Sequence, residues 1–368
     1  MRGLKEIVFY LIGALLIITS IYFVYLNHRD FERAMVRQAE SYLLATVRSQ
    51  AQSIEKYIGD ILGELETLSS SPILKSSIAF SQDKSGIEAE YYYLLQDSYR
   101  EVERLVDAIY LIDARGTVVN VSPFKPDITG QDFSRMPDVR IVLAEHQPYT
   151  SGIFENTSQE KTIANLYPVF VDSKFAGMLR AIILVERISS LTSHINEEGS
   201  RRAIISDNRG IVISHPDKAY IGKATSEVFS KDKFFGYGPE QAGSIAERMR
   251  QGQVGATVVA KTLIAYCPVH IGSNFWSIAV AMDYSVISSP IIKNARNNLI
   301  FAGFIFLIFF AAGMIYYRTH KKKDELLISA ATLDIINKQL HLEIKERKEI
   351  QQELQDYLHG GKKNTPPE

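Results

Sequence analysis

Two long runs without a charged residue constrain this chain more than any other feature of its 368 residues. Residues 7–26 and residues 299–317 are uncharged and predominantly apolar. An α-helix rises about 1.5 Å per residue, so each run covers about 30 Å, the thickness of the hydrocarbon core of a bilayer. We therefore expect two transmembrane helices, because the second run in particular is apolar on every face.

The first run has an alternative interpretation as a cleaved signal peptide. It is long for that role, and no small-x-small cleavage site precedes the polar residues 27–29. We therefore expect an uncleaved anchor, preceded by a short cytoplasmic N-terminus at residues 1–6.

Basic residues at the outer ends of the two runs predict the orientation of the chain. Arg2 and Lys5 precede the first run, and a basic stretch at 318–323 follows the second. Positive charge marks the cytoplasmic side of a span, so both ends are expected in the cytoplasm and residues 27–298 outside it. The predicted location is the cell membrane, the inner one where a cell has two, with membrane lipid as a partner.

Residues 27–79 are expected to form a stalk helix and its connection. Apolar side chains recur there in steps of three and four, which indicates one helical face. These positions are Val47, Ala51, Ile54, Ile58, Ile61, Leu65 and Leu68. Two serines followed by Pro72 predict the end of the helix.

The region beyond the stalk contains an internal duplication. The pattern D-x-R-G-x-V occurs at 113–118 and again at 207–212, each time between short apolar segments, as in a β-hairpin whose glycine closes the turn. Pro, Val, Ser and Phe recur in the same order at 168–175 and 268–275. We therefore expect an α+β fold with two antiparallel-sheet modules, here called the distal module (residues 80–199) and the proximal module (residues 200–298).

Composition argues against several classes of function. The 41 basic and 42 acidic residues give a net charge of -1, which offers no reason to expect a nucleic-acid partner. The single cysteine, Cys267, excludes an intramolecular disulfide and a multi-cysteine zinc site, and the eight histidines show no metal-binding spacing. Phosphate-binding glycine loops and hydrolase motifs are absent from the sequence. We expect neither a cofactor nor an enzyme here.

Three segments carry a resemblance to a known family: IYLIDARGTVVNVSP (109–123), AIISDNRGIVISHPDKAYIG (203–222) and IAYCPVHIGSNFWSIAVAM (264–282). In this order, after a long helix and between two spans, they resemble the double Cache sensors of prokaryotic membrane receptors, which carry two PAS-like modules in tandem. The resemblance covers residues 1–317. This region also resembles the N-terminal parts of sensor histidine kinases and diguanylate cyclases. It implies that a small molecule binds the distal module, between the sheet and the loops above it.

The resemblance also indicates where to look for ligand contacts. Members that bind amino acids carry an arginine followed two residues later by an aromatic, in the loop after the first hairpin. The corresponding stretch here is 134–140, where Asp138 and Val139 stand in place of the expected aromatics. Arg135 or Arg140 would take the arginine role only with a shift in register, so we expect an anionic or zwitterionic ligand of open identity.

Five further residues are candidate ligand contacts. Tyr110 on the first predicted strand would offer a ring face and a hydroxyl. Tyr149 and Ser151 lie at a strand entry that the resemblance places near the pocket. Asn165 and Tyr167 share one face of a later strand, because side chains alternate along a strand. An ordinary role in the core or on the surface remains an alternative for each of them.

The cytoplasmic segment 318–358 is expected to form a signalling helix. Leucines recur at seven-residue spacing, with Arg347 interrupting the series: Leu326, Leu333, Leu340 and Leu354. This spacing predicts a parallel coiled coil and hence a homodimer, and an amphipathic helix packed on another domain is the alternative. Residues 359–368 are expected to be disordered.

The sequence predicts a transmembrane sensor that passes a ligand signal to the cytoplasm. Segment 340–358 is similar to linkers that precede histidine kinase or diguanylate cyclase domains, and neither domain follows within these residues. We expect a cytoplasmic output domain or a partner kinase, so the chain would be a natural sensor, a truncated product or the front of a longer receptor. The first choice is the sensory part of a two-component histidine kinase. The alternatives are a diguanylate cyclase, a chemoreceptor-like protein, an anchored enzyme and a structural membrane protein.

Overall fold

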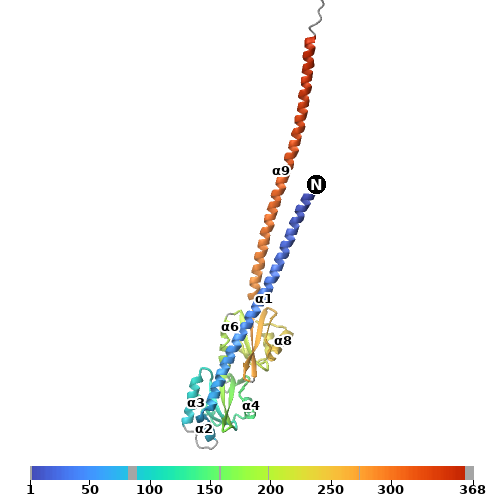
Figure 1. Ribbon diagram of the computed structural model, residues 1–368. Helices are drawn as coiled ribbons and strands as arrows, with labels where there is room; N and C mark the ends of the chain where they lie inside the picture. Colours follow the sequence, from blue (N-terminus) through green and yellow to red (C-terminus); the bar gives the residue numbers. More distant parts are fainter. Residues whose placement is uncertain (1, 82–88, 157–158, 198, 273, 361–368) are drawn as a thin grey trace, which may run out of the picture. The chain divides into compact units, whose positions relative to one another are not determined.

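The computed structural model describes residues 2–81, 89–156, 159–197, 199–272 and 274–360 (Figure 1). It divides into two compact units, one made of Met1–His28 with Lys293–Glu368 and the other of Arg29–Ile292. Two long helices, α1 (Arg2–Ser70) and α9 (Ser285–Gly360), contribute to both units. Of the tail expected to be disordered, residues 359–360 instead belong to α9, and residues 361–368 lie outside the described residues.

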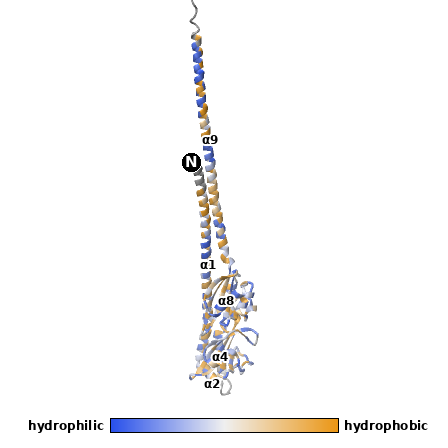
Figure 2. Ribbon diagram, turned by 90° about the vertical axis from the view of Figure 1, so that its right-hand side faces the viewer, coloured by the Kyte–Doolittle hydropathy of each residue, from blue (hydrophilic) through white to orange (hydrophobic). Residues whose placement is uncertain are grey.

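The unit formed by the chain ends contains both apolar runs. Among the described residues, α1 and α9 are long and apolar enough to cross a membrane, and the hydropathy colouring shows both stretches (Figure 2). Large apolar side chains such as Phe23 and Phe301 are more than two-thirds exposed. Side chains of this kind are stable when hydrocarbon surrounds them, so the exposed surface agrees with the expected pair of spans.

The unit Arg29–Ile292 contains two antiparallel sheets. The distal sheet has the order β2-β1-β6-β5-β3, with β4 also paired to β5, and the proximal sheet has the order β8-β7-β11-β10-β9. The distal strands are β1 (Ala108–Asp113), β2 (Val118–Ser122), β3 (Tyr149–Thr150), β4 (Phe154–Glu155), β5 (Lys161–Val171) and β6 (Lys174–Leu184). The proximal strands are β7 (Arg201–Asp207), β8 (Val212–Ser214), β9 (Gly255–Val259), β10 (Thr262–Ile271) and β11 (Asn274–Asp283).

Helices connect and cover these strands. Before the first strand come α2 (Pro72–Ser81) and α3 (Ala89–Val102), and α4 (Pro137–Glu145) lies between β2 and β3. The chain passes to the proximal module through α5 (Val185–Ser190) and α6 (Ser193–Glu197). Its own helices are the short 3-10 turn η1 (Lys218–Tyr220), α7 (Thr225–Lys231) and α8 (Pro239–Arg250).

The duplication predicted from the sequence is confirmed by the matching strand orders. In each module the first hairpin pairs with the last strand, and the last two strands form a long second hairpin. The first hairpins turn in the same way. Asp113 Oδ1 accepts hydrogen bonds from the backbone N–H of Arg115 and Thr117, and Asp207 Oδ1 accepts them from Arg209 and Ile211. The glycine that closes each turn has a φ of +88° or +80°, a conformation that other residues rarely adopt.

The apolar stripe of α1 packs against one face of both sheets. Val47, Ile54, Ile58, Ile61 and Leu65 are all at most 1% exposed and belong to a core cluster shared with the two sheets. The helix ends at Ser70 and α2 begins at Pro72, as the sequence predicts. One helix therefore provides a common core for the two modules.

The opposite face of each sheet has its own core. In the proximal module, α7 and α8 cover this face with an aromatic cluster that includes Phe229, Phe235 and Tyr237. In the distal module, α4 and the loop before it cover the face that carries Ala108, Tyr110 and Ile112. Alternation along each strand thus separates a shared, apolar side from a side that differs between the modules.

Truncation of the α1 stripe should destabilise the whole unit Arg29–Ile292. We expect Ile58→Ala to lower the free energy of unfolding by about 2–5 kcal/mol, because it leaves a cavity in the shared core. The measurement is urea unfolding of the full chain in detergent micelles, followed by the fluorescence of Trp276, the single tryptophan. Ile73→Ala on α2, where the side chain is 41% exposed, is the control and should cost well under half as much. Equal losses would contradict the shared core.

Candidate ligand-binding site

A charged side chain lies inside the distal sheet, on the face away from α1. Arg180 on β6 is only 3% exposed and lies opposite Tyr110 of β1 and Leu166 of β5. Directly opposed residues of antiparallel strands point to the same face. Tyr110, Arg180 and Leu166 therefore form a row across the centre of the face that α4 covers.

Asp138 on α4 supplies the counter-charge. The Nε of Arg180 donates a hydrogen bond to Asp138 Oδ2 over 2.7 Å, and both side chains are buried. Asp138 lies in the first turn of α4, where the helix dipole favours a negative charge. A buried charge is tolerated when it is paired, so α4 and the sheet depend on each other at this point.

Three aromatic rings surround the guanidinium of Arg180. Its Cζ lies 5.8 Å from the ring centroids of both Tyr110 and Phe133, and 5.0 Å from that of Phe154. Such rings attract a cation and exclude water from it. The Nη2 atom is buried and has no hydrogen-bond partner among the described residues. The site thus offers a buried cationic N–H group that fits an oxygen of a carboxylate or a phosphate.

Two tyrosine hydroxyls near this row remain protonated at neutral pH. Burial raises the pKa of Tyr110, and the charge of Arg180 opposes that rise. Burial also raises the pKa of Tyr149, with Arg209 opposing the rise and Asp138 adding to it. Each hydroxyl can therefore donate a hydrogen bond to a ligand as well as accept one.

The structure brings two of the sequence candidates close to Arg180. Tyr110 contacts its guanidinium, and Tyr149 lies opposite Leu166 at the end of the same row. Arg135 and Arg140 are both exposed. Arg140 is on α4, where the residues buried against the sheet are Asp138, Val139 and Val142. Neither arginine joins this group.

The other candidates lie elsewhere. The hydroxyl of Ser151 donates to the carbonyl of Gly152 and accepts from the N–H of Ala164, so it fixes the chain after β3. Asn165 accepts a hydrogen bond from Thr150 and lies opposite Ala181, which belongs to the core under α1. Tyr167 packs on that core as well. The structure therefore places Asn165 and Tyr167 on the opposite face from Arg180.

Sequence reasoning missed the charged pair itself. Arg180 lies in a strand-like apolar run, and this was the available signal, because an arginine inside a central strand is rarely buried without a partner. In the sequence, Asp138 stands out only as a departure from an aromatic pattern. Phe133 and Phe154 carried no signal, since aromatic residues are common in any core.

The duplication provides an internal comparison for this site. In the proximal sheet the row that matches Tyr110, Arg180 and Leu166 consists of Ile204, Ala279 and Tyr266. Ala279 is 1% exposed and part of an apolar core. The same sheet position therefore folds well without a charge, so the fold does not require the arginine.

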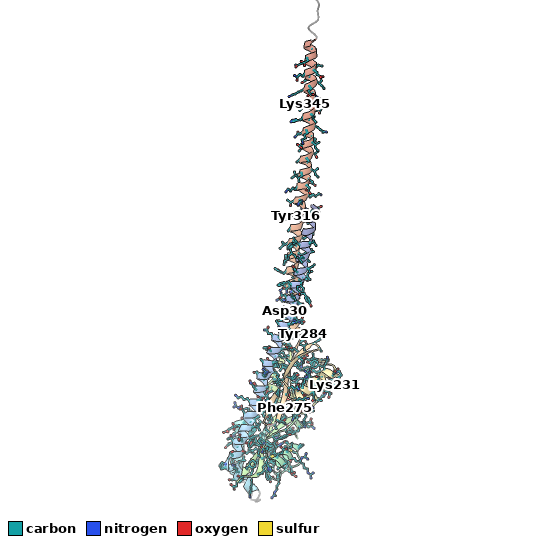
Figure 3. All side chains as sticks on the ribbon, turned by 45° about the vertical axis from the view of Figure 1, so that its right-hand side comes forward. Asp30, Lys231, Phe275, Tyr284, Tyr316 and Lys345 are labelled. Atoms are coloured by element: carbon teal, nitrogen blue, oxygen red, sulfur yellow. The ribbon has the colours of Figure 1, made fainter. Side chains whose placement is uncertain are left out.

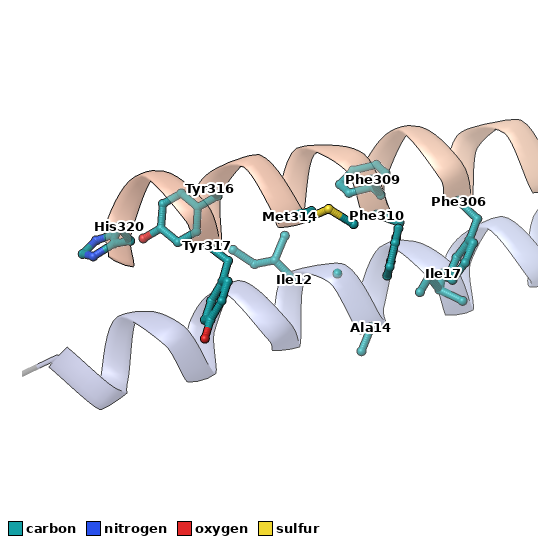
Figure 4. Close-up of a pocket in the computed structure, with 12 residues that line it drawn as sticks. Ile12, Ala14, Ile17, Phe306, Phe309, Phe310, Met314, Tyr316, Tyr317 and His320 are labelled. Atoms are coloured by element: carbon teal, nitrogen blue, oxygen red, sulfur yellow. The ribbon is translucent and has the colours of Figure 1, made fainter. Parts of the chain in front are cut away.

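A cavity lies in the other unit, between the apolar runs of α1 and α9. It has a volume of about 590 Å³ and is lined mainly by apolar side chains, among them Ile17, Phe306 and Met314 (Figure 4). A groove of this kind is expected wherever two spans pack with large and small residues in hydrocarbon. We do not assign it to the ligand.

The remainder of α9, beyond the second span, is exposed. The leucines at seven-residue spacing are 52–70% exposed, and the side chains around Lys345 project outward from the helix (Figure 3). Within the described residues no group of three or more His, Cys, Asp or Glu could hold a metal ion. Cys267 is buried, and burial raises the pKa of its thiol to about 11.

Comparison with known proteins identifies the family of the chain. The family described as Cache domain (dCache_1) matches residues 31–291, which is more than half of the chain. A search of curated proteins found no match. Solved structures share the fold at low sequence identity.

Three ligand-binding domains illustrate this similarity. The periplasmic sensory domain of the Campylobacter jejuni chemoreceptor Tlp1 has a TM-score of 0.54 at 12% identity, covering 70% of this chain and 99% of that one. The ligand-binding domain of the Pseudomonas fluorescens chemoreceptor CtaA in complex with L-isoleucine has a TM-score of 0.53 at 17% identity, covering 70% and 97%. That of the Pseudomonas aeruginosa amino acid chemoreceptor PctC in complex with GABA has a TM-score of 0.50 at 18% identity, covering 67% and 100%.

A longer protein shares the fold as well. An extracellular ligand-binding receptor from Desulfohalobium retbaense has a TM-score of 0.51 at 16% identity, and the match covers 64% of this chain and 39% of the receptor. Identities this low show a common fold. The family match over residues 31–291 shows that the chain belongs to the Cache domain family.

Proposed function

We propose that this protein is a multi-pass transmembrane receptor whose distal module binds a small zwitterion, such as an amino acid, at Arg180 and Asp138. The observation that carries the proposal is the buried guanidinium of Arg180, whose Nη2 has no hydrogen-bond partner in the described part of the chain. The proximal module has Ala279 at the matching position. A ligand carboxylate would bind Arg180 and a ligand ammonium would bind Asp138. The aromatic rings of Tyr110, Phe133 and Phe154 would enclose the rest of the ligand.

The solved structures support this ligand class. CtaA is described in complex with L-isoleucine or L-serine, and PctC in complex with GABA. Each of these ligands carries one carboxylate and one ammonium group. A site that holds an arginine next to an aspartate matches that pair of charges, whereas a site with an arginine alone would favour a simple anion.

Ligand entry would itself generate the signal. Arg180, Asp138 and Phe133 are each at most 6% exposed, so a ligand reaches the guanidinium only if α4 or the strand that carries Phe154 moves away from the sheet. A ligand shifts such an equilibrium by its difference in affinity for the two arrangements. Coupling between two sites of a protein is typically about 1–3 kcal/mol.

The rest of the chain supports transmission to the cytoplasm. The basic flanks of the two spans favour residues 27–298 outside the membrane and both ends inside. In α9 the exposed leucines at 326, 333, 340 and 354 would be covered by the same helix of a second copy. The linker pattern of 340–358 favours a histidine kinase as output, with a diguanylate cyclase or a chemoreceptor-type output as alternatives.

Zwitterions should stabilise the protein through Arg180. We expect L-isoleucine, L-serine or GABA to raise the melting temperature of the full chain in detergent micelles, followed by Trp276 fluorescence. At a concentration about 100-fold above Kd the gain is about 2.7 kcal/mol. L-isoleucine methyl ester, which lacks the carboxylate, should have no effect.

Two conservative variants test whether the rise in melting temperature depends on Arg180. Arg180→Lys keeps the charge but loses the planar fork of donors, so it should abolish the shift. Arg140→Lys changes an exposed arginine of α4 in the same way and should leave the shift intact. If no zwitterion in the panel raises the melting temperature, or if both variants respond like the wild type, the proposed site is wrong.

The exposed leucine seam of α9 should bring two copies together. In a Cys267→Ala background we expect Leu333→Cys and Leu340→Cys to form an intermolecular disulfide in membrane vesicles under mild oxidation, because these positions would face each other across a parallel pair. Lys345→Cys, on the outer side of the seam, is the control and should remain monomeric on a non-reducing gel. Equal crosslinking at all three positions would indicate random collision.

A further inference from the structure

A short segment at the edge of the distal sheet forms part of the candidate site. Residues 149–155 include β3, β4 and the turn between them, and they place Tyr149 and Phe154 beside the row that contains Arg180. Each of the two strands has only two residues, and both pair with β5 alone. Because only a few backbone hydrogen bonds hold this segment, it is weakly attached to the sheet. Its position therefore depends on what packs outside it.

The neighbour outside this segment is the first hairpin of the proximal module. The backbone of Gly152 lies directly against the guanidinium of Arg209. A methyl group at Gly152 would overlap that guanidinium and lie 3.2 Å from Asp207 Oδ2. A side chain at Gly152 would therefore have to displace the guanidinium of Arg209, and glycine permits this close approach of the two modules.

Arg209 is held in place by its own hairpin. Its Nε and Nη2 donate hydrogen bonds to Asp207 Oδ2 over 3.0 Å and 2.9 Å. The carboxylate of Asp207 is only 3% exposed, and its Oδ1 caps the turn, so it is a rigid support. In this two-point contact both donors share one carboxylate oxygen, which restrains the guanidinium more than a single hydrogen bond would.

Further contacts join the same two surfaces. Lys161 at the start of β5 donates a hydrogen bond from Nζ to the carbonyl of Ile221 in the proximal module. Beside these contacts a cleft of about 390 Å³ separates the two modules. Phe154 lines it on the distal side, and Ile211 and Lys223 line it on the proximal side. Phe154 therefore contacts Arg180 and also borders the proximal module.

We propose that Arg209 is a positioning residue for the distal site: it holds the segment 149–155 in the arrangement in which Phe154 covers Arg180. This inference rests on the proposed function, which makes Arg180 the ligand-binding group. A ligand that displaces Phe154 would move the segment against Arg209 and Asp207, at the end of β7. Because coupling is reciprocal, the arrangement of the proximal hairpin would in turn set the affinity of the distal site.

The duplication supplies a matched control. Arg115 occupies the same position in the D-x-R-G turn of the distal module, and both arginines are exposed. Arg209→Ala and Arg115→Ala thus remove the same side chain from the same kind of turn, and only the first change removes the contact with Gly152. Gly152→Ala is a second way to displace Arg209, and Gly243→Ala on α8, where an added methyl meets nothing within 4 Å, is its control.

The test is hydrogen–deuterium exchange of the full chain in detergent micelles, read by mass spectrometry without any ligand. We expect Arg209→Ala and Gly152→Ala to speed amide exchange in peptides covering 149–156 by about fivefold or more, because these amides exchange by local opening. Arg115→Ala should change only peptides around its own turn, and Gly243→Ala should leave 149–156 unchanged.

Two results would overturn the proposal. One is unchanged exchange at 149–156 in both Arg209→Ala and Gly152→Ala. The other is an increase in exchange spread evenly over both modules, which would show a loss of stability instead of a local role. Arg209→Lys, which loses only the two-point contact, checks this with a milder change. Because no ligand is present in the exchange experiment, a negative result there would not contradict the zwitterion site at Arg180. Failure of zwitterion binding would likewise not contradict the role of Arg209 in positioning the segment.

Discussion

The structure depends on one apolar stripe along α1. Without α1, each of the two antiparallel sheets would expose an apolar face. A sheet stays folded only when such a face is covered. The residues from Val47 to Leu65 cover both sheets with a single helix, so neither module has a complete core without it. The same helix contains the first candidate span. A change in packing within the modules therefore acts directly on a helix that continues toward the membrane.

This shared core leaves the other face of each sheet free to diverge. Copies of one module must keep the face that meets α1, since its side chains are interlocked with the stripe. The face toward α4 in the distal module and toward α7 and α8 in the proximal module carries no such common constraint. The proximal copy fills it with aromatic rings, and the distal copy places a charge there. A ligand site is expected on the face that can vary, and Arg180 lies on that face.

Local patterns made much of the fold predictable. The stripe on α1, the two D-x-R-G turns and the second hairpins depend on neighbouring residues, and the structure confirms them. The face of Asn165 and Tyr167 was harder to predict because it depends on register across β5 and β6. A slip of one residue reverses every side chain, and the pairing shifts between Val169 and Phe170. Asp138 and Arg180, 42 positions apart, meet only in three dimensions.

The Arg180–Asp138 pair is difficult to explain by stability alone. Removing two charges from water costs several kcal/mol for each ion, and replacing a buried ion pair by well-packed apolar side chains is often neutral or stabilising. The proximal sheet shows that such a replacement is available to this fold, since Ala279 occupies the matching position. The pair also leaves Nη2 without a hydrogen-bond partner among the described residues, which adds a desolvation cost. This cost, at a position where the proximal copy has alanine, supports the proposal that Arg180 and Asp138 bind a partner from solution.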